Sequence, residues 1–289
     1  MMINLINKNN LLFADAHVHI YDCFDLAFFF DSAFSNFKKI ASGFGYLTGY
    51  TSILFLAEGR NERWFDQLSR LADDWRVNNK DNLVTYQFAR THEPVSISVR
   101  GDGSPPLFLI AGRQIVTKEK LEVLSLVSAS DIPDGLSLHT TVESVVEHGG
   151  VPVVPWGFGK WMGKRGKILN EFLEKGSEFP IFLGDNSGRP SFLPPPPQFH
   201  RGKGNGIRIL PGSDPLPFPT ECRKPGSFGF AITGSVDPDK PGDEIRRILL
   251  NPRTRPISYG QLETMPRFLR NQLLMQFRKL KNRTNRNTA

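Results

Sequence analysis

Two histidines stand one residue apart in the stretch FADAHVHIYDCFD, residues 13–25, of a chain that has six histidines in 289 residues. His17 and His19 end an apolar run that is typical of a strand, and side chains at positions i and i+2 of a strand point to the same face. Their imidazoles can then reach one cation, because histidine nitrogens bind zinc-like ions at about 2.0–2.1 Å. A structural pair, hydrogen-bonded in the core, is the alternative interpretation. The spacing favours half of a metal site.

Carboxylates follow two later apolar runs, with Asp185 in FLGDNSGRP and Asp214 in LPGSDPLPF. Given the histidine pair upstream, Asp214 is the predicted third metal ligand. Asp185 and Asp214 are also the predicted catalytic residues, because a carboxylate in a metal site can position a water or accept its proton. Ordinary turn or helix-cap chemistry is the alternative for both. The predicted cofactor is one divalent ion, either zinc, manganese or iron.

A basic loop rich in tryptophan, WGFGKWMGKRG at 156–166, separates a predicted strand from a predicted helix. Cations and backbone N–H groups at such a place can hold an anion. Lys160 and Arg165 of this loop, with Arg189 of NSGRP, are therefore the predicted binding residues for a small anionic substrate. The glycines do not form the GxxxxGK[ST] phosphate loop. A packed loop with a solvated basic edge is the alternative.

Strand and helix patterns alternate along the chain, and the polar residues above follow the strands. The predicted strands cover 10–20, 50–59, 151–157, 179–190 and 207–218, and the predicted helices cover 23–41, 61–75, 140–150 and 164–176. The stretch 83–128 holds short β-rich pieces instead. Such alternation is typical of a parallel α/β sheet or barrel, in which sites lie at the C-terminal ends of the strands.

The composition, 39% hydrophobic and 22% charged, permits a core of ordinary size, and we expect one domain over residues 1–265. No apolar run approaches the ~20 residues that span a membrane, and no secretion signal is evident. Cys23 and Cys222 do not make a disulfide framework. We therefore expect a cytoplasmic protein.

The net charge of +7 belongs to the C-terminal segment, residues 266–289, which has seven basic residues and no acidic one. A helix from about Pro266 to Leu280 is predicted, since proline is favoured in a first helical turn, and the last nine residues are expected to fray. We favour a docked helix with a solvated basic edge. A contact for anionic lipid or nucleic acid is the alternative.

The order of these motifs resembles the PHP superfamily, the polymerase and histidinol phosphatase domain. Four segments between roughly residues 13 and 216 carry the resemblance: DAHVHI, AGRQIVTKEKLEVLSLV, HGGVPVVPWG and PGSDPLP. The resemblance implies a distorted (β/α)7-type barrel with a β-rich middle segment. It also implies a metal-dependent phosphoesterase.

Three positions depart from the family pattern. Gln114 stands where the family has a metal-bridging glutamate, Trp156 where it has a histidine after the GG strand, and Leu216 where its final motif has a histidine. The ligands that remain are His17, His19 and Asp214, a set that suits one metal ion.

The sequence thus predicts a metal-dependent hydrolase, a phosphoesterase acting on an anionic substrate. One alternative is a PHP-like protein without catalysis that binds a ligand or partner after losing part of its metal site. The other is an amidohydrolase-type C–N hydrolase, because that superfamily also opens with HxH and ends with a strand-terminal aspartate. In that case Lys160 would be its middle-strand lysine.

Overall fold

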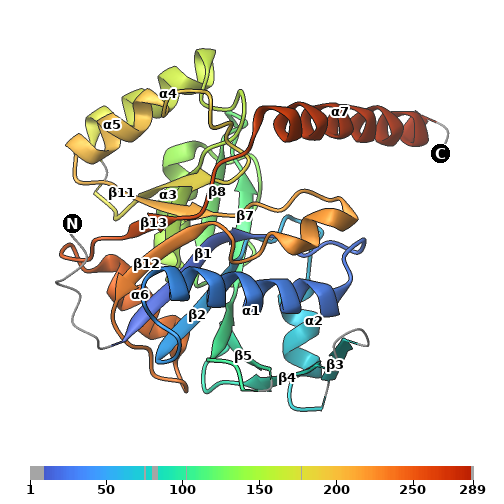
Figure 1. Ribbon diagram of the computed structural model, residues 1–289. Helices are drawn as coiled ribbons and strands as arrows, with labels where there is room; N and C mark the ends of the chain where they lie inside the picture. Colours follow the sequence, from blue (N-terminus) through green and yellow to red (C-terminus); the bar gives the residue numbers. More distant parts are fainter. Residues whose placement is uncertain (1–9, 75, 80–83, 102, 177, 288–289) are drawn as a thin grey trace.

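The computed structural model describes residues 10–287 except 75, 80–83, 102 and 177 (Figure 1). The strands are β1 Leu11–Val18, β2 Tyr50–Leu56, β3 Arg76–Asn79, β4 Val84–Arg90, β5 Ser96–Arg100, β6 Leu107–Ile110, β7 Gly112–Val116, β8 Glu122–Leu126, β9 Val151–Pro155, β10 Phe182–Asn186, β11 Arg208–Gly212, β12 Gly229–Thr233 and β13 Ile257–Tyr259. The helices are α1 Leu26–Gly43, α2 Trp64–Leu71, α3 Leu138–Glu147, α4 Gly163–Lys175, α5 Pro197–Gly204, α6 Pro241–Leu250 and α7 Met265–Asn287, with a 3₁₀ helix at Pro219–Arg223.

The strands form two mixed sheets. The eight-stranded sheet has the order β13-β12-β1-β2-β6-β5-β4-β3, and the five-stranded sheet has the order β11-β10-β9-β8-β7. Strands β1, β2 and β6 are mutually parallel, as are β9, β10 and β11, whereas the remaining neighbours pair antiparallel. The chain is therefore an α/β protein.

The expectation of a (β/α)7-type barrel is wrong, because the strands of the described residues form two sheets and no closed barrel. The reason lies at β1, where antiparallel β12 pairs with Leu11 to Ala14 and so occupies the edge that a barrel would offer to β11. The segment after β11 reaches only the end of β1, where the Asp214 N–H donates to the His17 carbonyl oxygen at 2.8 Å. Alternation of strand and helix along a sequence does not reveal such a long-range antiparallel pairing.

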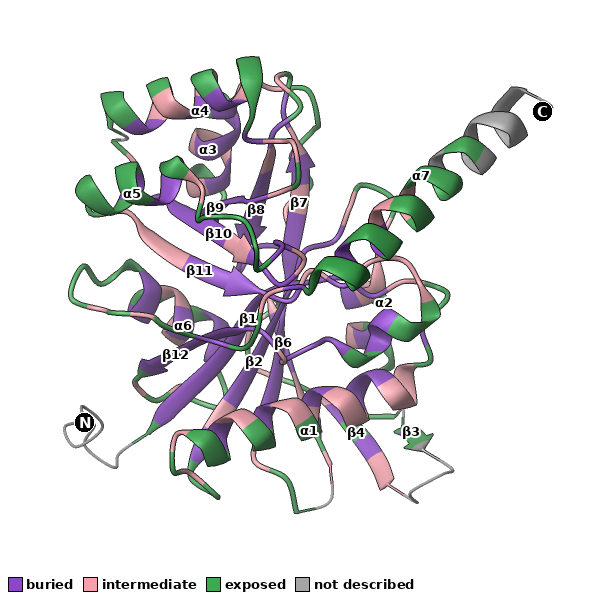
Figure 2. Ribbon diagram, turned by 45° about the horizontal axis from the view of Figure 1, so that its top comes forward, coloured by how far each residue is buried: buried purple, intermediate pink, exposed green. Residues whose placement is uncertain are grey.

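Three clusters of buried side chains separate the layers. One lies between α1 and the eight-stranded sheet, the second lies between the two sheets and includes α6, and the third lies between the five-stranded sheet and helices α3, α4 and α5. Side chains alternate along β1, so that Leu11 and Phe13 join the first cluster while Leu12 and Ala14 join the second. Figure 2 shows the buried strands at the centre, with partly exposed helices around them. The first strand is thus held firmly on both faces.

Four of the predicted helices are confirmed with shifted ends, as α1, α2, α3 and α4. Helix α1 begins where Asp25 accepts hydrogen bonds from the N–H groups of Ala27 and Phe28, at 2.8 and 3.1 Å. Helix α7 begins near the predicted proline but continues to Asn287 instead of ending near Leu280. It projects from the body of the molecule (Figures 1 and 2). No described helix combines the length and the apolar character needed to cross a bilayer.

Candidate metal centre

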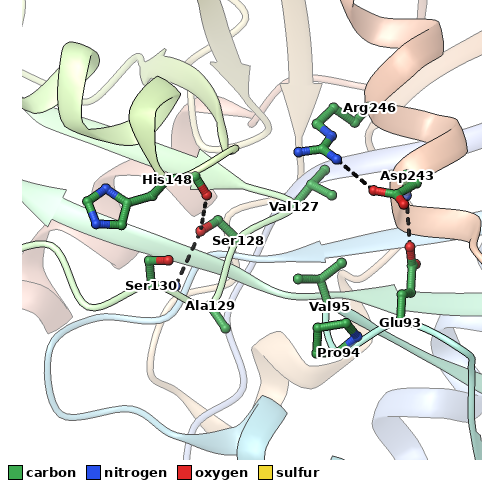
Figure 3. A pocket seen from close by; sticks show the side chains of 10 residues that line it. All are labelled: Glu93, Pro94, Val95, Val127, Ser128, Ala129, Ser130, His148, Asp243 and Arg246. Carbon is green, nitrogen blue, oxygen red and sulfur yellow. Dashed lines mark hydrogen bonds and ion pairs between the residues drawn. The ribbon is translucent and has the colours of Figure 1, made fainter.

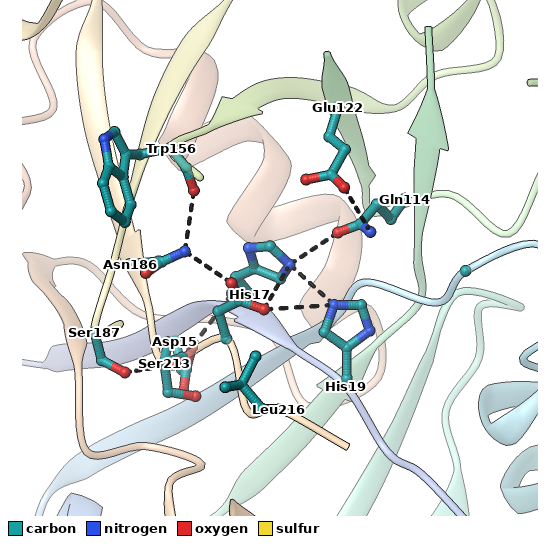
Figure 4. A network of polar contacts seen from close by, with 12 residues as sticks. Asp15, His17, His19, Gln114, Glu122, Trp156, Asn186, Ser187, Ser213 and Leu216 are labelled. Atoms are coloured by element: carbon teal, nitrogen blue, oxygen red, sulfur yellow. Dashed lines mark hydrogen bonds and ion pairs between the residues drawn. The ribbon is translucent and has the colours of Figure 1, made fainter. Parts of the chain in front are cut away.

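The end of β1 and the segment after β11 bring three potential metal ligands together. His17 lies in β1, His19 directly follows that strand, and Asp214 follows β11. The distance from His17 Nε2 is 3.1 Å to His19 Nε2 and 3.5 Å to Asp214 Oδ1, and His19 Nε2 lies 3.7 Å from the same oxygen. Figure 4 shows the two imidazoles with Gln114 beside them. The sequence-predicted ligands therefore meet at one point.

The spacing of these atoms is close to that of ligands around a single ion. Donor atoms at about 2.0–2.2 Å from a tetrahedral ion lie about 3.3–3.6 Å from one another. The side-chain oxygen of Gln114 lies 3.1 Å from His17 Nε2 and supplies a neutral oxygen donor at the same place. Two imidazoles, one carboxylate and one amide oxygen thus fit a divalent ion.

The backbone is shaped to bring the two segments close. Gly212 packs so near β1 that a Cβ there would lie 2.3 Å from the His17 amide nitrogen. Asp214 adopts a φ of 45°, a left-handed conformation that costs a non-glycine residue about 1 kcal/mol. The Asn186 side-chain amide donates to Asp214 Oδ2 at 2.7 Å, while Oδ1 faces the histidines. The strained backbone and this hydrogen bond hold the carboxylate in place.

A carboxylate supports His19 from the side opposite Asp214. Glu62 Oε2 lies 3.3 Å from His19 Nδ1 and also accepts the Gly59 N–H at 2.8 Å. Burial tends to lower the pKa of His19, but the hydrogen bond to Glu62 and the nearby carboxylates outweigh it and raise that pKa. A carboxylate on Nδ1 fixes the tautomer whose Nε2 is free to bind a metal. This arrangement is that of a supported metal ligand.

The Glu62→Gln substitution is expected to weaken metal binding about 10–100-fold, because it removes the charged partner that orients a ligating imidazole. Affinity is measured by competition with a coloured chelator. Glu147→Gln, an exposed position at the end of α3, is the matched control. Unchanged affinity in the Glu62 variant would show that His19 needs no such support.

His17 and Asp214 have the ionisation states that a ligand needs. Burial lowers the pKa of His17, so its imidazole is neutral at pH 7. Burial tends to raise the pKa of Asp214, but His17, His19 and Lys160 reverse the shift and hold that pKa below its ordinary value. His17 Nδ1 is buried and has no hydrogen-bond partner among the described residues. The site therefore offers a neutral imidazole at His17 and a charged carboxylate at Asp214.

Gln114, Glu122 and Lys160 form the wall next to the histidines. The Gln114 side-chain amide donates to Glu122 Oε1 at 3.4 Å, and Lys160 forms an ion pair with the same oxygen. Gln114 thus occupies the place that the sequence resemblance assigns to a bridging glutamate. Lys160 of the basic loop lies near enough to influence the pKa of Asp214.

Asp15 lies in β1 two residues before His17 and is fully buried. It accepts hydrogen bonds from the N–H groups of Ser213, Gly226 and His17 at 2.8, 2.9 and 3.2 Å. Burial raises the pKa of Asp15 to about 7 despite these hydrogen bonds. Asp15 therefore links β1 to the segment that carries Asp214.

The other sequence-predicted residues have partners of their own. Both carboxylate oxygens of Asp185 accept hydrogen bonds from Arg189, at 2.7 and 2.8 Å, and both side chains are largely buried. Arg165 donates to the Gly159 carbonyl oxygen at 2.7 Å. Trp156 is buried, and its carbonyl oxygen accepts the Asn186 side-chain amide at 3.0 Å. Of the three predicted substrate-binding cations, Lys160 is the one whose partner, Glu122, also contacts Gln114 beside the histidines.

Sequence reasoning missed Glu62, Glu122 and Asn186. Asn186 directly follows Asp185 in a predicted strand end, so its position was visible although its role was not. Glu62 lies in the segment between β2 and α2, and Glu122 begins β8. Glu62 belongs to no quoted motif, and Glu122 lies within AGRQIVTKEKLEVLSLV but was not singled out there. Only the folded arrangement brings the two residues to the histidines.

A separate cavity of about 460 Å³ lies between the segment after β8 and the start of α6 and shares no residue with this cluster (Figure 3). Its charged groups are paired with one another, since Arg246 donates to Asp243 at 2.6 Å and the Asp243 N–H donates to Glu93 at 3.0 Å. We therefore place the candidate site at the histidines.

No family model and no curated protein sequence matches the chain. Among solved structures, PsfC from Pseudomonas syringae PB-5123 is similar with a TM-score of 0.51 and 13% identity, over 92% of this chain and 98% of that one. At that identity the likeness concerns the fold alone.

Two endonuclease Q structures are also similar, each at 13% identity. The lesion-specific endonuclease PfuEndoQ from Pyrococcus furiosus has a TM-score of 0.49, over 86% of this chain and 59% of that one. An endonuclease Q complex with a 27-mer duplex carrying an abasic lesion has a TM-score of 0.44, over 83% of this chain and 56% of that one. This chain thus spans little more than half the length of those enzymes.

Proposed function

We propose that this protein is a metal-dependent hydrolase of the phosphoesterase class that acts on an anionic substrate, as its motif resemblance to the PHP superfamily implies. The observation that carries the proposal is the convergence of His17 Nε2, His19 Nε2 and Asp214 Oδ1 within 4.8 Å of one another. Asp214 lies almost 200 residues from the two histidines in the sequence. Their meeting at one point, beside a carboxylate that supports His19, is the arrangement that binding a divalent ion requires.

In this proposal, His17, His19 and Asp214 hold the ion and the amide oxygen of Gln114 lies beside it. A bound divalent ion supplies Lewis acidity toward a phosphoryl oxygen and a water of lowered pKa. Asn186 fixes the carboxylate of Asp214, and Glu62 fixes the ring of His19. Among the described residues, Asp214 is the acid that lies within 4 Å of both histidines, and it is the group proposed to position or deprotonate the attacking water.

In this proposal the remaining predicted site residues, Asp185, Arg165 and Arg189, stabilise the segments around the site and do not contact the substrate. The Asp185–Arg189 pair braces the segment that carries Asn186, and Arg165 braces the basic loop through Gly159. Lys160 is the cation that meets the substrate, since its charge reaches the metal ligands. A small anionic substrate in the cytoplasm remains the expectation from the sequence.

The Lys160→Gln substitution is expected to raise KM for an anionic phosphoester about tenfold with little change in kcat, because it removes a cation that binds substrate and transition state alike. Steady-state kinetics with a negatively charged substrate and with a neutral ester of the same leaving group measure the effect. Lys164→Gln in the same loop, an exposed lysine, is the control. An equal effect on the neutral ester would assign Lys160 to the fold instead.

The hydrolase proposal is tested with protein that has been depleted of metal and then reloaded with manganese, zinc or iron. Hydrolysis of p-nitrophenyl phosphate and of bis(p-nitrophenyl) phosphate is expected to appear on loading and to disappear with a chelator. A chain that binds one equivalent of metal yet hydrolyses neither ester would favour the alternative below.

Gln114 and Leu216 favour one alternative, a PHP-like protein that binds a ligand without catalysis. Gln114 is a neutral amide where the family pattern has a bridging carboxylate, and Leu216 lies in the segment that should supply a histidine. The protein side chains of this site therefore supply less negative charge than those of the family's dinuclear site would. No specific contact favours the amidohydrolase reading, since Lys160 pairs with Glu122.

A further inference from the structure

Helix α7 carries an exposed apolar stripe. Leu269, Leu273, Phe277 and Leu280 follow the spacing i, i+4, i+8 and i+11, which places them on one side of a helix. Their exposed fractions are 48, 61, 66 and 57%. The helix is attached to the body by a different side, where Phe268 and Asn271 are buried at 6 and 4% exposure. The docked helix favoured from the sequence is therefore only half right, because its longest apolar stripe faces away from the body.

Loop residues extend the apolar surface at the base of α7. The Phe158 and Phe192 rings lie 5.0 and 6.3 Å from the Phe268 ring, measured between centroids. Phe158 and Phe192 are themselves 51 and 52% exposed. Exposed rings from two loop segments thus lie against Phe268 near the start of the projecting helix. Clustering of this kind marks an interaction surface, whereas single exposed apolar residues do not.

The same helix carries the excess charge of the chain. Seven basic residues and no acidic residue lie within 266–289. Arg270 is exposed and lies beside the stripe by helical spacing, whereas the exposed Arg278 lies on another side of the helix and donates to the Pro217 carbonyl oxygen. A partner for this surface must therefore be negatively charged and must also accept leucine and phenylalanine side chains.

We propose that α7 is an interfacial helix that docks the protein on an anionic lipid surface, with Leu269, Leu273, Phe277 and Leu280 inserted among the acyl chains and the arginines at the headgroups. Amphipathic helices that bind membranes in this way combine a basic polar face with Leu and Phe on the other face. The boundary between headgroups and acyl chains can take both kinds of side chain at once. The negative charge of the lipid headgroups is complementary to the basic residues of the helix.

Other occupants fit less well. A nucleic acid would pair with the arginines but would leave the leucines and Phe277 in water. A second copy of the chain would cover the stripe but would bring seven positive charges against seven. Both remain as outcomes of the test.

The full-length protein is mixed with vesicles of phosphatidylcholine alone or of phosphatidylcholine with phosphatidylglycerol, and bound protein is measured by co-sedimentation. We expect binding to the anionic vesicles and little to the neutral ones. The triple substitution Leu269→Asn, Leu273→Asn and Phe277→Asn is expected to abolish it, because the apolar insertion is lost while all charges remain. Arg270→Gln is expected to weaken binding about fivefold, since each basic residue near an anionic surface adds about that factor.

Matched controls are Leu47→Asn and Arg253→Gln, which alter an exposed leucine and an exposed arginine outside α7. Far-ultraviolet circular dichroism and the melting temperature show whether each variant remains folded. Absence of binding by the wild-type protein to anionic vesicles would overturn the proposal whatever the variants do. Binding that the triple variant keeps, tight binding to duplex DNA at physiological salt, or dimerisation lost in the triple variant would each overturn it as well.

Discussion

Replacing His19 by alanine is expected to abolish stoichiometric metal binding and to reduce any phosphoester hydrolysis by more than about a hundredfold. Loss of an outer partner of a ligand already costs about 10–100-fold, and His19 is proposed to be a ligand itself. His17→Ala is expected to have the same effect. Metal content is measured by elemental analysis of protein purified without chelator, and activity is measured with the metal in excess.

The fold should survive both substitutions, because the apolar residues that anchor β1 on both faces, such as Ala16 and Val18, are left unchanged. We expect the metal-free variants to melt within several degrees of the metal-free wild type, at about 2–4 °C for each kcal/mol lost. His200→Ala, which changes an exposed histidine of α5, is the control for handling and for surface metal binding. Full metal content in a folded His17 or His19 variant would show that the ion, if any, binds elsewhere.

Replacing Gln114 by glutamate is expected to tighten metal binding by at least about tenfold, because it adds a charged oxygen ligand 3.1 Å from His17 Nε2. In the absence of metal the same change is unfavourable. The new carboxylate would face Glu122, which now accepts a hydrogen bond from the Gln114 amide. The variant should therefore melt at a lower temperature than the wild type without metal, and should gain more stability when metal is added.

The two effects of Gln114→Glu are separated by recording melting curves across a metal titration, with Gln87→Glu on the exposed face of β4 as the control for added charge. If the variant bound metal no more tightly than the wild type, the equivalence of Gln114 to the bridging glutamate of the PHP pattern would be refuted. Hydrolysis gained together with affinity would show that the missing carboxylate at position 114 limits catalysis in the wild type.

The sequence singled out His17, His19 and Asp214, which the structure brings together, because both motifs are local. The spacing of His17 and His19 fixes their common direction once β1 is a strand, and Gly212 to Asp214 turns directly after β11. The PHP resemblance, and not the residue spacing, predicted that the segment with His17 and His19 approaches the segment with Asp214. The structure shows the contact that does it, a hydrogen bond from the Asp214 N–H to the His17 carbonyl oxygen.

The remainder depended on long-range pairing that no local pattern contains. The barrel was predicted from the alternation of strands and helices together with the family resemblance, whereas antiparallel β12 on the edge of β1 leaves two separate sheets among the described strands. Asp185 and Arg189 were selected one by one for their chemistry, but Asp185 lies at the end of β10, Arg189 follows four residues later, and the two pair with each other. Glu62 supports His19 through a turn whose direction is set only in the folded chain.

The most direct test of the central claim is a crystal structure of the protein grown with manganese or zinc, with anomalous diffraction recorded at the absorption edge of that metal. The proposal predicts one strong anomalous peak about 2.0–2.2 Å from His17 Nε2, His19 Nε2 and Asp214 Oδ1. An anomalous map with no peak at these three atoms, from crystals in which the metal was in excess, would contradict it.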